Sequence, residues 1–276
     1  MRKITFGMRG HDYEIKNDIN GLAEKMVATG IHTVQLALPF SFPAWPTDSA
    51  NLNPGFAQEI KTTFAKHDLS IGILSCYINM IHPDLAIREK LLQKFEAYVQ
   101  FAHQVGAPIV ASETGCVLPE IQYTEENFTE EAFQEMAQSV KRLVKAGETF
   151  GVTIGIEAGI NHPLHNLEKI KRLLEMVDSP YLGIILDATN LITVDTAENQ
   201  VELVRQAFQM FGEKIVAIHL KDYTLQDKKV IPTNMGHGQI DYQAILDIVE
   251  YNKPFCYVIM EETKEPFVKE ALKLVE

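Results

Sequence analysis

The sequence predicts a single-domain α/β protein, a (β/α)₈ or TIM barrel, over residues 1–276. Short apolar runs rich in β-branched residues alternate with longer amphipathic stretches along the whole chain, which is typical of βαβ units. Eight such runs can be counted, and no linker, repeat or low-complexity segment interrupts them. A chain of 276 residues also has the usual length of one such barrel.

The elements are expected in a regular order along the chain. The strands are predicted at 4–8, 33–38, 70–77, 108–113, 152–157, 182–187, 214–220 and 256–261. Apolar residues at three- and four-residue steps predict the clearest helices at 84–104, 129–149 and 198–211, and a last helix in EPFVKEALKLVE would close the ring. An open doubly wound sheet is the alternative fold, but FGMRGHDYE does not match the G-x-G-x-x-G turn expected after its first strand.

Composition and charge exclude several classes of partner. The formal net charge of −12 disfavours binding to a nucleic-acid backbone, and no apolar run approaches the roughly 20 residues of a membrane span. The cysteines Cys76, Cys116 and Cys256 are far apart and form no C-x-x-C motif, which favours a reducing compartment. We therefore expect a cytoplasmic protein with no nucleic-acid or membrane partner and, with no apolar leader at its N-terminus, no signal peptide.

Four polar residues end consecutive apolar strands, where barrel enzymes carry their reacting groups. They are Glu157, Asp187, His219 and Glu261 on the fifth to eighth strands. Neighbouring strands would bring the four side chains together. Three carboxylates and an imidazole suit one divalent metal ion, Mn²⁺, Mg²⁺ or Co²⁺, and also admit Zn²⁺. The alternative is that each carboxylate caps the helix that follows it.

This series, with HLKD at 219–222 and G-x-G-x-x-D at 236–241, resembles the xylose isomerase-like TIM barrel family of sugar phosphate isomerases and epimerases. That family includes ketose 3-epimerases, inosose dehydratases and an endonuclease. The resemblance covers essentially the whole chain. It implies that Glu157 and Glu261 hold the metal and also act as the acid/base pair.

The resemblance implies a divalent-metal-dependent isomerase or epimerase of carbohydrate metabolism, with manganese as one candidate metal. Proton transfer next to a carbonyl would pass through an enediolate, and two carboxylates could remove and return the proton. An inosose-dehydratase-like lyase is the alternative enzyme, and a non-catalytic sugar-binding barrel is the alternative outside enzymes.

The chain departs from the family pattern at three places. Asn190 stands where the epimerases have a histidine, three residues after the aspartate, and His162 and His165 lie where a second glutamate is usual. The endonuclease branch needs Asp-x-His before the glycine pair, whereas Asp227 is followed by two lysines. DNA cleavage is therefore not expected, which agrees with the negative charge.

Other polar residues near the strand ends are predicted to bind the carbohydrate substrate. They are Glu113, His82, Asn190, Lys221 and His237. Helix caps, turns and a structural Lys–Asp pair are the alternative roles for these residues. An aromatic loop with Phe40, Phe42 and Trp45 is expected to pack on a sugar or on another subunit, so the chain is also expected to form a homo-oligomer.

Overall fold

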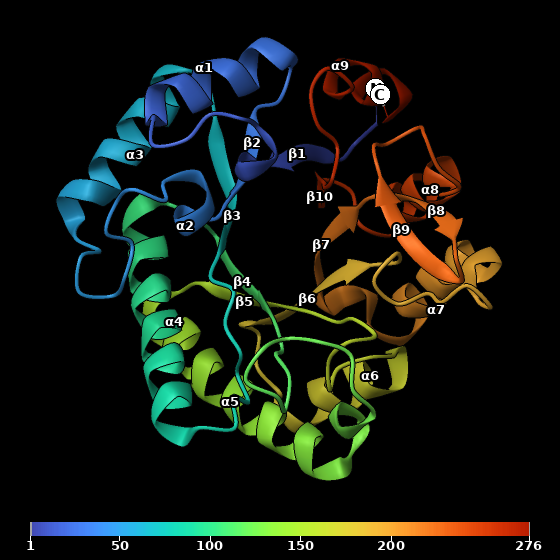
Figure 1. The fold of residues 1–276 in the computed structure, drawn as a ribbon. Helices are drawn as coiled ribbons and strands as arrows, with labels where there is room; N and C mark the ends of the chain where they lie inside the picture. Colours follow the sequence, from blue (N-terminus) through green and yellow to red (C-terminus); the bar gives the residue numbers. More distant parts are fainter. Residues whose placement is uncertain (1, 276) are drawn as a thin grey trace.

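The strands close into a barrel in the computed structural model, which describes residues 2–275. Within this range eight parallel strands follow one another around the ring in the order β1, β10, β7, β6, β5, β4, β3, β2, with the helices outside (Figure 1). Their bounds are β1 Thr5–Arg9, β2 Thr33–Leu36, β3 Ser70–Ser75, β4 Ile109–Glu113, β5 Thr153–Glu157, β6 Leu182–Asp187, β7 Ile215–Leu220 and β10 Tyr257–Met260. The predicted fold class is confirmed.

The helices begin and end where local sequence signals place them. Their bounds are α1 Ile19–Thr29, α2 Leu38–Ser41, α3 Pro54–Lys66, α4 Leu85–Val105, α5 Glu130–Phe150, α6 Leu167–Met176, α7 Gln200–Phe211, α8 Tyr242–Asn252 and α9 Val268–Val275. In α4, for example, the Asp84 carboxylate accepts hydrogen bonds from the amides of Ala86 and Ile87, and Gly106 ends the helix at φ +85°.

Within residues 2–275, no helix has both the length and the apolar character needed to cross a membrane.

The core has two parts, and the inner one explains where the functional side chains point. Most buried apolar residues pack between the strands and the surrounding helices. A second cluster draws on several strands of the ring: Ile73, Ile109, Ala111, Ile185, Ala217 and Ile259. Side chains alternate between the two faces of a strand, so residues two positions beyond members of this cluster also point inward. Asp187, His219 and Glu261 occupy such positions at the carboxyl ends of their strands.

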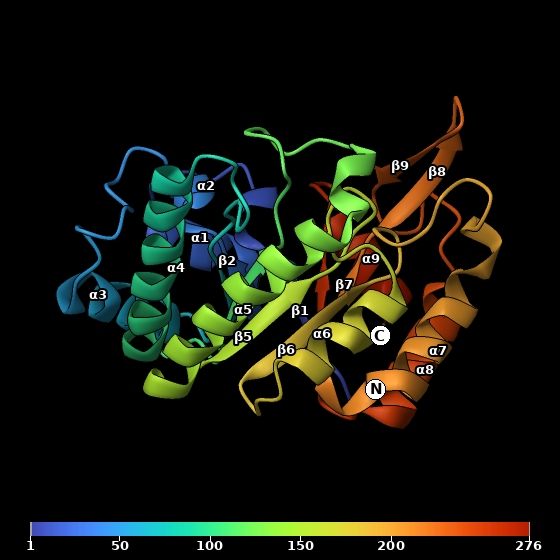
Figure 2. The same cartoon turned by 90° about the horizontal axis from the view of Figure 1, so that it is seen from below.

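A β-hairpin follows β7 and was not predicted from the sequence. Strands β8 (Asp222–Gln226) and β9 (Lys229–Thr233) pair antiparallel and rise beyond the barrel in the side view (Figure 2). Their connection uses Asp227 and Lys228, both in the left-handed region at φ +48° and +59°. Two-residue hairpin turns of this kind usually contain Asn-Gly or Asp-Gly, and the Asp-Lys pair carries no such signal.

Candidate metal centre

The four residues predicted at the strand ends lie together inside the mouth of the barrel. Glu157, Asp187 and His219 each place a ligand atom within 4.8 Å of the others. Glu261 follows β10, and its Oε1 lies 3.1 Å from His219 Nδ1, while Glu157 Oε2 lies 3.0 Å from the same nitrogen. All four side chains are buried. We call Glu157, Asp187, His219 and Glu261 the strand-end cluster.

Cations balance the carboxylates of this cluster. Lys221 Nζ lies 2.8 Å from Asp187 Oδ2 and 3.2 Å from Glu261 Oε2. From β1, an Arg9 nitrogen lies 3.4 Å from Glu261 Oε2. Lys221, predicted to bind substrate, therefore lies beside the cluster and contacts two of the proposed metal ligands. Its substrate role stays a prediction.

Burial and charge shift the pKa values of the cluster in opposite directions. Burial alone would lower the pKa of His219, but Glu157 and Glu261 outweigh it and raise that pKa to about 9. Burial alone would raise the pKa of Glu261, but His219 and Lys221 outweigh it and lower that pKa to about 2. Burial raises the pKa of Glu157. In the absence of a metal, the proton on His219 and the ammonium of Lys221 offset part of the negative charge of the three carboxylates.

Gln35 orients the imidazole of His219, and sequence reasoning missed it. Gln35 is fully buried on β2; its Nε2 donates to the Tyr77 hydroxyl at 3.1 Å, and its Oε1 lies 2.7 Å from His219 Nε2. The amide oxygen can only accept, so His219 Nε2 carries the proton and Nδ1 faces Glu157 and Glu261. Metal-binding histidines are commonly held in this way by a second hydrogen bond. The only sequence signal was a glutamine inside the apolar strand TVQL.

Two atoms of the cluster fit a metal better than they fit their present neighbours. Within the described residues, His219 Nδ1 and Asp187 Oδ2 are buried but form no hydrogen bond of acceptable geometry, although charged atoms lie close to both. Leaving such atoms unsatisfied costs free energy. Both are ordinary ligand atoms for a divalent ion, and the carboxylate-rich donor set suits a hard or intermediate metal. The residues present therefore fit a divalent cation.

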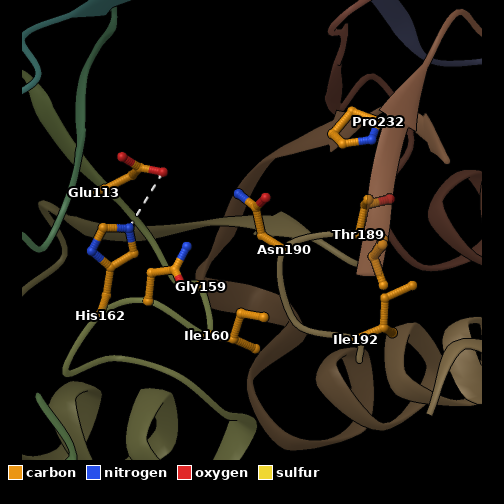
Figure 3. Close-up of a pocket in the computed structure, with 10 residues that line it drawn as sticks. Glu113, Gly159, Ile160, His162, Thr189, Asn190, Ile192 and Pro232 are labelled. Atoms are coloured by element: carbon orange, nitrogen blue, oxygen red, sulfur yellow. Dashed lines mark ion pairs between the residues drawn. The ribbon is translucent and has the colours of Figure 1, made fainter. Parts of the chain in front are cut away.

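A cavity of about 220 Å³ adjoins the cluster (Figure 3). Its walls come from the ends of β4, β5 and β6 and from the β9 arm of the hairpin: Glu113, Gly159, Ile160, Asn161, His162, Thr189, Asn190, Ile192, Val230 and Pro232. Asn190 connects the cavity to the cluster, because its Nδ2 donates to Glu157 Oε1 at 2.6 Å. Two residues predicted to bind substrate, Glu113 and Asn190, thus line this cavity.

One wall of the cavity carries an ion pair. His162 Nε2 lies 3.4 Å from Glu113 Oε1, and the dashed line in Figure 3 marks this pair. His162 Nδ1 lies 2.7 Å from the carbonyl oxygen of Gly115. Burial alone would raise the pKa of Glu113 and lower that of His162, but their mutual attraction outweighs it and shifts both the other way. The sequence identified both residues without indicating that they meet.

The other two residues predicted to bind substrate, His82 and His237, lie elsewhere. Of the described residues, those that line the cavity include neither. His82 Nδ1 accepts a hydrogen bond from the Asp84 amide at 3.1 Å, in the turn before α4. His237 packs its ring on Phe267, with centroids 4.6 Å apart. Their proposed role in substrate binding stays untested.

The glycine turn that carries His237 is held in place. The Asp222 carboxylate accepts hydrogen bonds from the amides of Gly236, Gly238 and Ile240, at 2.8 to 2.9 Å. A charged acceptor on three amides fixes the local backbone. HLKD and the glycine motif, which carry part of the family resemblance, are thus joined through Asp222, a contact that the sequence did not predict.

The aromatic loop after β2 is only partly available to a ligand. Phe42 is fully buried, and Trp45 stacks on it with centroids 4.7 Å apart. Phe40 is 51% exposed and packs against His11 and Tyr77. The expectation that all three aromatic rings face a sugar or another subunit is therefore wrong for Phe42, because its ring fills the core.

Solved structures with this fold include metal-containing proteins and an epimerase. The 3-keto-D-glucoside 4-epimerase YcjR from E. coli superimposes with a TM-score of 0.76 at 14% identity, over 99% of this chain and 98% of that chain. The IOLI protein with a bound zinc atom superimposes with a TM-score of 0.72 at 16% identity, over 100% of this chain and 95% of that chain. A xylose isomerase-like TIM barrel protein from Mycobacterium smegmatis in complex with magnesium superimposes with a TM-score of 0.71 at 15% identity. The superposition covers 93% of this chain and 86% of that chain. At these identities the likeness shows the fold.

Sequence comparison gives a more specific result. An inosose dehydratase from Clostridium beijerinckii is 23% identical over 201 residues, which cover 65% of this chain and 65% of that protein. The match therefore spans slightly less than two thirds of the relative. The model of the xylose isomerase-like TIM barrel family matches residues 23–275. The chain therefore belongs to the xylose isomerase-like TIM barrel family.

Proposed function

We propose that this chain is a divalent-metal-dependent enzyme that transfers a proton at the carbon next to the carbonyl group of a carbohydrate, as isomerases and epimerases do. The observation that carries the proposal is the position of His219 Nδ1, which lacks a good hydrogen bond within the described residues and lies 3.0 Å from Glu157 and 3.1 Å from Glu261. Membership of the family and the fit of the donor set to a cation support it.

Glu157, Asp187, His219 and Glu261 would hold the metal. When bound, the cation would supply positive charge beside the substrate oxygens, where negative charge develops as the proton leaves. Mn²⁺, Mg²⁺ and Co²⁺ suit the carboxylate-rich set, and the zinc and the magnesium in two proteins of the same fold lie within the range of candidate metals. His219 must lose its proton to bind the ion, and Gln35 leaves Nδ1 as the atom that would do so.

The two glutamates would perform the proton transfers. Glu157 and Glu261 extend from strands separated in the ring by β6 and β7, and they approach His219 Nδ1 with one carboxylate each. One carboxylate can remove the proton and the other can return it. Return to the same carbon gives epimerisation, and return to the neighbouring carbon gives aldose–ketose isomerisation. Asn190, which donates to Glu157 and lines the cavity, would orient the glutamate nearest the substrate.

Dehydration is the second candidate function. The curated relative at 23% identity is an inosose dehydratase, and dehydration begins with the same removal of a proton next to a carbonyl. It then requires an acid that helps a hydroxyl group to leave. The ion pair of Glu113 and His162 in the cavity wall offers a group of that type. A product that lacks one water would identify this function.

The test is a solvent-deuterium exchange screen on metal-stripped protein with added Mn²⁺, Mg²⁺ or Co²⁺, over a panel of ketoses, aldoses and inososes. We expect metal-dependent exchange at one carbon, which Glu157→Gln and Glu261→Gln remove. Glu89→Gln, at an exposed glutamate of α4, is the matched control and should keep it. Full exchange in both cluster variants would contradict the proposal. Sugar binding without exchange in the wild type would instead support a non-catalytic binding barrel.

A further inference from the structure

The geometry assigns a third proton-transfer group to this site: His162 acts as the acid that protonates a departing hydroxyl group, and Glu113 is its positioning residue. The assignment rests on the proposed function, because a hydroxyl group leaves in this way only after a proton has been removed beside the carbonyl. It goes beyond that function because epimerisation and isomerisation need only the two glutamates of the cluster.

The orientation of His162 is fixed by the backbone. The carbonyl oxygen of Gly115 can only accept a hydrogen bond, so the nitrogen 2.7 Å away, Nδ1, carries a proton. The Gly115 position requires glycine, because its φ is +87° and an added Cβ would lie 2.3 Å from Asn79 Oδ1. Asn79 also accepts from the Cys116 amide at 3.0 Å. Nε2 is therefore the atom that His162 directs toward Glu113.

Within the pair, Glu113 lies on the strand next to that of the proton-abstracting glutamate, because this residue of β4 is the register partner of Glu157 on β5. Figure 3 shows Glu113 and His162 on one side, Pro232 on the other and Asn190 between them. Asn190 donates to Glu157 and lines the same cavity as His162, so a ligand that fills the cavity contacts both His162 and the residue that is bonded to Glu157. Val230 and Pro232 of the hairpin contribute apolar side chains to the wall of the cavity.

The charges around His162 favour its protonated form. Glu113 faces it from the end of β4, and Glu157 adds a weaker attraction from the end of β5. Burial alone would lower the pKa of His162, but these carboxylates outweigh it and raise that pKa. A histidine that holds its proton beside a cavity, with one nitrogen fixed by the backbone, is suited to general acid catalysis.

The reaction step balances as an elimination of water. The Glu157 carboxylate takes the proton from the carbon next to the carbonyl, and the electron pair of that C–H bond forms a carbon–carbon double bond to the next carbon. The C–O bond at this second carbon breaks, and its electron pair goes to the hydroxyl oxygen. His162 Nε2 gives its proton to that oxygen, so water leaves. Glu157 then returns a proton to solvent, and His162 regains one. The substrate class is thus a carbohydrate ketone with a hydroxyl group on the carbon beyond the acidic C–H.

The test compares two leaving groups in the metal-loaded enzyme. The substrates are an inosose and its analogue in which fluorine replaces the departing hydroxyl group. Fluoride leaves as a weak base and depends little on an acid, whereas hydroxide depends on one. We expect His162→Gln to slow the loss of water by at least about 100-fold, the usual range for a lost general acid, and to slow the loss of fluoride far less. Glu113→Gln should act in the same direction with a smaller effect.

His165→Gln is the matched control, since His165 lies in the same loop but its ring packs on Phe128 with centroids 4.4 Å apart. It should slow neither reaction selectively. Equal slowing of both leaving groups by His162→Gln would overturn the assignment, because a merely structural role predicts that result. Wild-type enzyme that exchanges deuterium into the inosose without losing water would also overturn it, while leaving the proposed function intact. Absence of deuterium exchange in the wild-type enzyme would overturn both the role of His162 and the proposed function.

Discussion

Two groups of ionised side chains in this barrel share a chemistry but differ in their surroundings. On the outer surface, Arg142 of α5 binds Glu89 and Glu96 of α4, and every one of its guanidinium nitrogens donates to a carboxylate. These side chains are 32% to 50% exposed. The side chains of the strand-end cluster and of Lys221 are only 1% to 9% exposed. There, buried polar atoms also lack good hydrogen bonds within the described residues.

This difference in exposure has different energetic consequences for the two groups. An exposed ion pair is solvated in both the folded and the unfolded chain, so it contributes little to the free energy of unfolding. Three buried carboxylates beside a buried lysine and histidine are costly to desolvate, and their mutual attraction offsets only part of that cost. A divalent ion bound among them would make the arrangement favourable. The energetics of folding therefore do not by themselves explain the cluster, whereas the fit of its ligand atoms to a divalent cation does.

Of the changes that test this comparison, Lys221→Met in the metal-free protein should cause the largest loss of stability. Removing one partner of a buried ion pair leaves Asp187 and Glu261 less compensated, which costs about 3–5 kcal/mol of unfolding free energy. Saturating Mn²⁺ should restore most of the loss, because the ion replaces the missing positive charge. Urea unfolding with and without Mn²⁺ measures both quantities. The same loss in both conditions would mean that no cation binds beside these carboxylates.

The next effect is the dependence of metal-free stability on pH. The pKa of His219 is raised from 6.5 to about 9 in the folded protein, so its stabilising contribution is complete below pH 6.5 and is lost as the pH rises through 9. The pKa of Glu261 is lowered from 4.5 to about 2, so its contribution is present above pH 4.5 and lost as the pH falls through 2. Both contributions are complete between these limits, from pH 4.5 to 6.5.

Thermal unfolding of the metal-free protein should therefore show a decline above pH 6.5, of up to roughly 3 kcal/mol for a shift of this size. His219→Asn serves as the control, since it removes the titrating group and should flatten the decline. A melting temperature that stays constant or rises from pH 6.5 to 9 would show that the two glutamates do not hold a proton on His219.

A smaller effect, on metal affinity, is expected when Gln35 is replaced by Met, which has similar length but is only a weak hydrogen-bond acceptor for His219. The ring would lose the contact that directs Nδ1 at the cluster. Loss of such a supporting contact typically lowers metal affinity about 10- to 100-fold. Calorimetric titration with Mn²⁺ measures the affinity, and Gln58→Met on the exposed face of α3 is a control of the same residue type. Unchanged affinity in Gln35→Met would leave Gln35 with a packing role alone.

The smallest effect should come from Arg142→Ala in the exposed network. We expect a loss of less than about 1 kcal/mol in unfolding free energy and no change in metal affinity. Urea unfolding in low and high salt checks this, because screening should reduce the difference further. A loss as large as that of Lys221→Met would remove the distinction between the two groups.

The sequence was sufficient for the barrel and for the membership of the cluster. Strand and helix periodicity differ clearly in this chain, and a polar residue at the end of an apolar strand has a defined position in a barrel. Glu157, Asp187, His219 and Glu261 could therefore be assigned from local pattern alone. Their meeting at His219 follows from strand order, which the alternation of strands and helices also predicts.

The supporting contacts could not be predicted, because they depend on how distant segments meet. Gln35 reaches His219 from a strand 184 positions earlier in the chain, and nothing in TVQL indicates that partner. The pairing of Glu113 with His162 depends on the conformation of the loop between β5 and α6. The hairpin escaped notice because its turn, Asp227 and Lys228, adopts a left-handed conformation without glycine. Phe42 was misplaced because an aromatic residue in a loop carries no local signal of burial.

A crystal structure of the protein soaked with Mn²⁺, with the ion located by anomalous scattering, tests the central claim most directly. The account predicts one ion bonded to His219 Nδ1 and to oxygens of Glu157, Asp187 and Glu261, at distances of about 2.0–2.3 Å. It also predicts that Nδ1 is the coordinating nitrogen, with Gln35 still bonded to Nε2. An ion found elsewhere, or an unoccupied cluster at saturating Mn²⁺ and neutral pH, would contradict it.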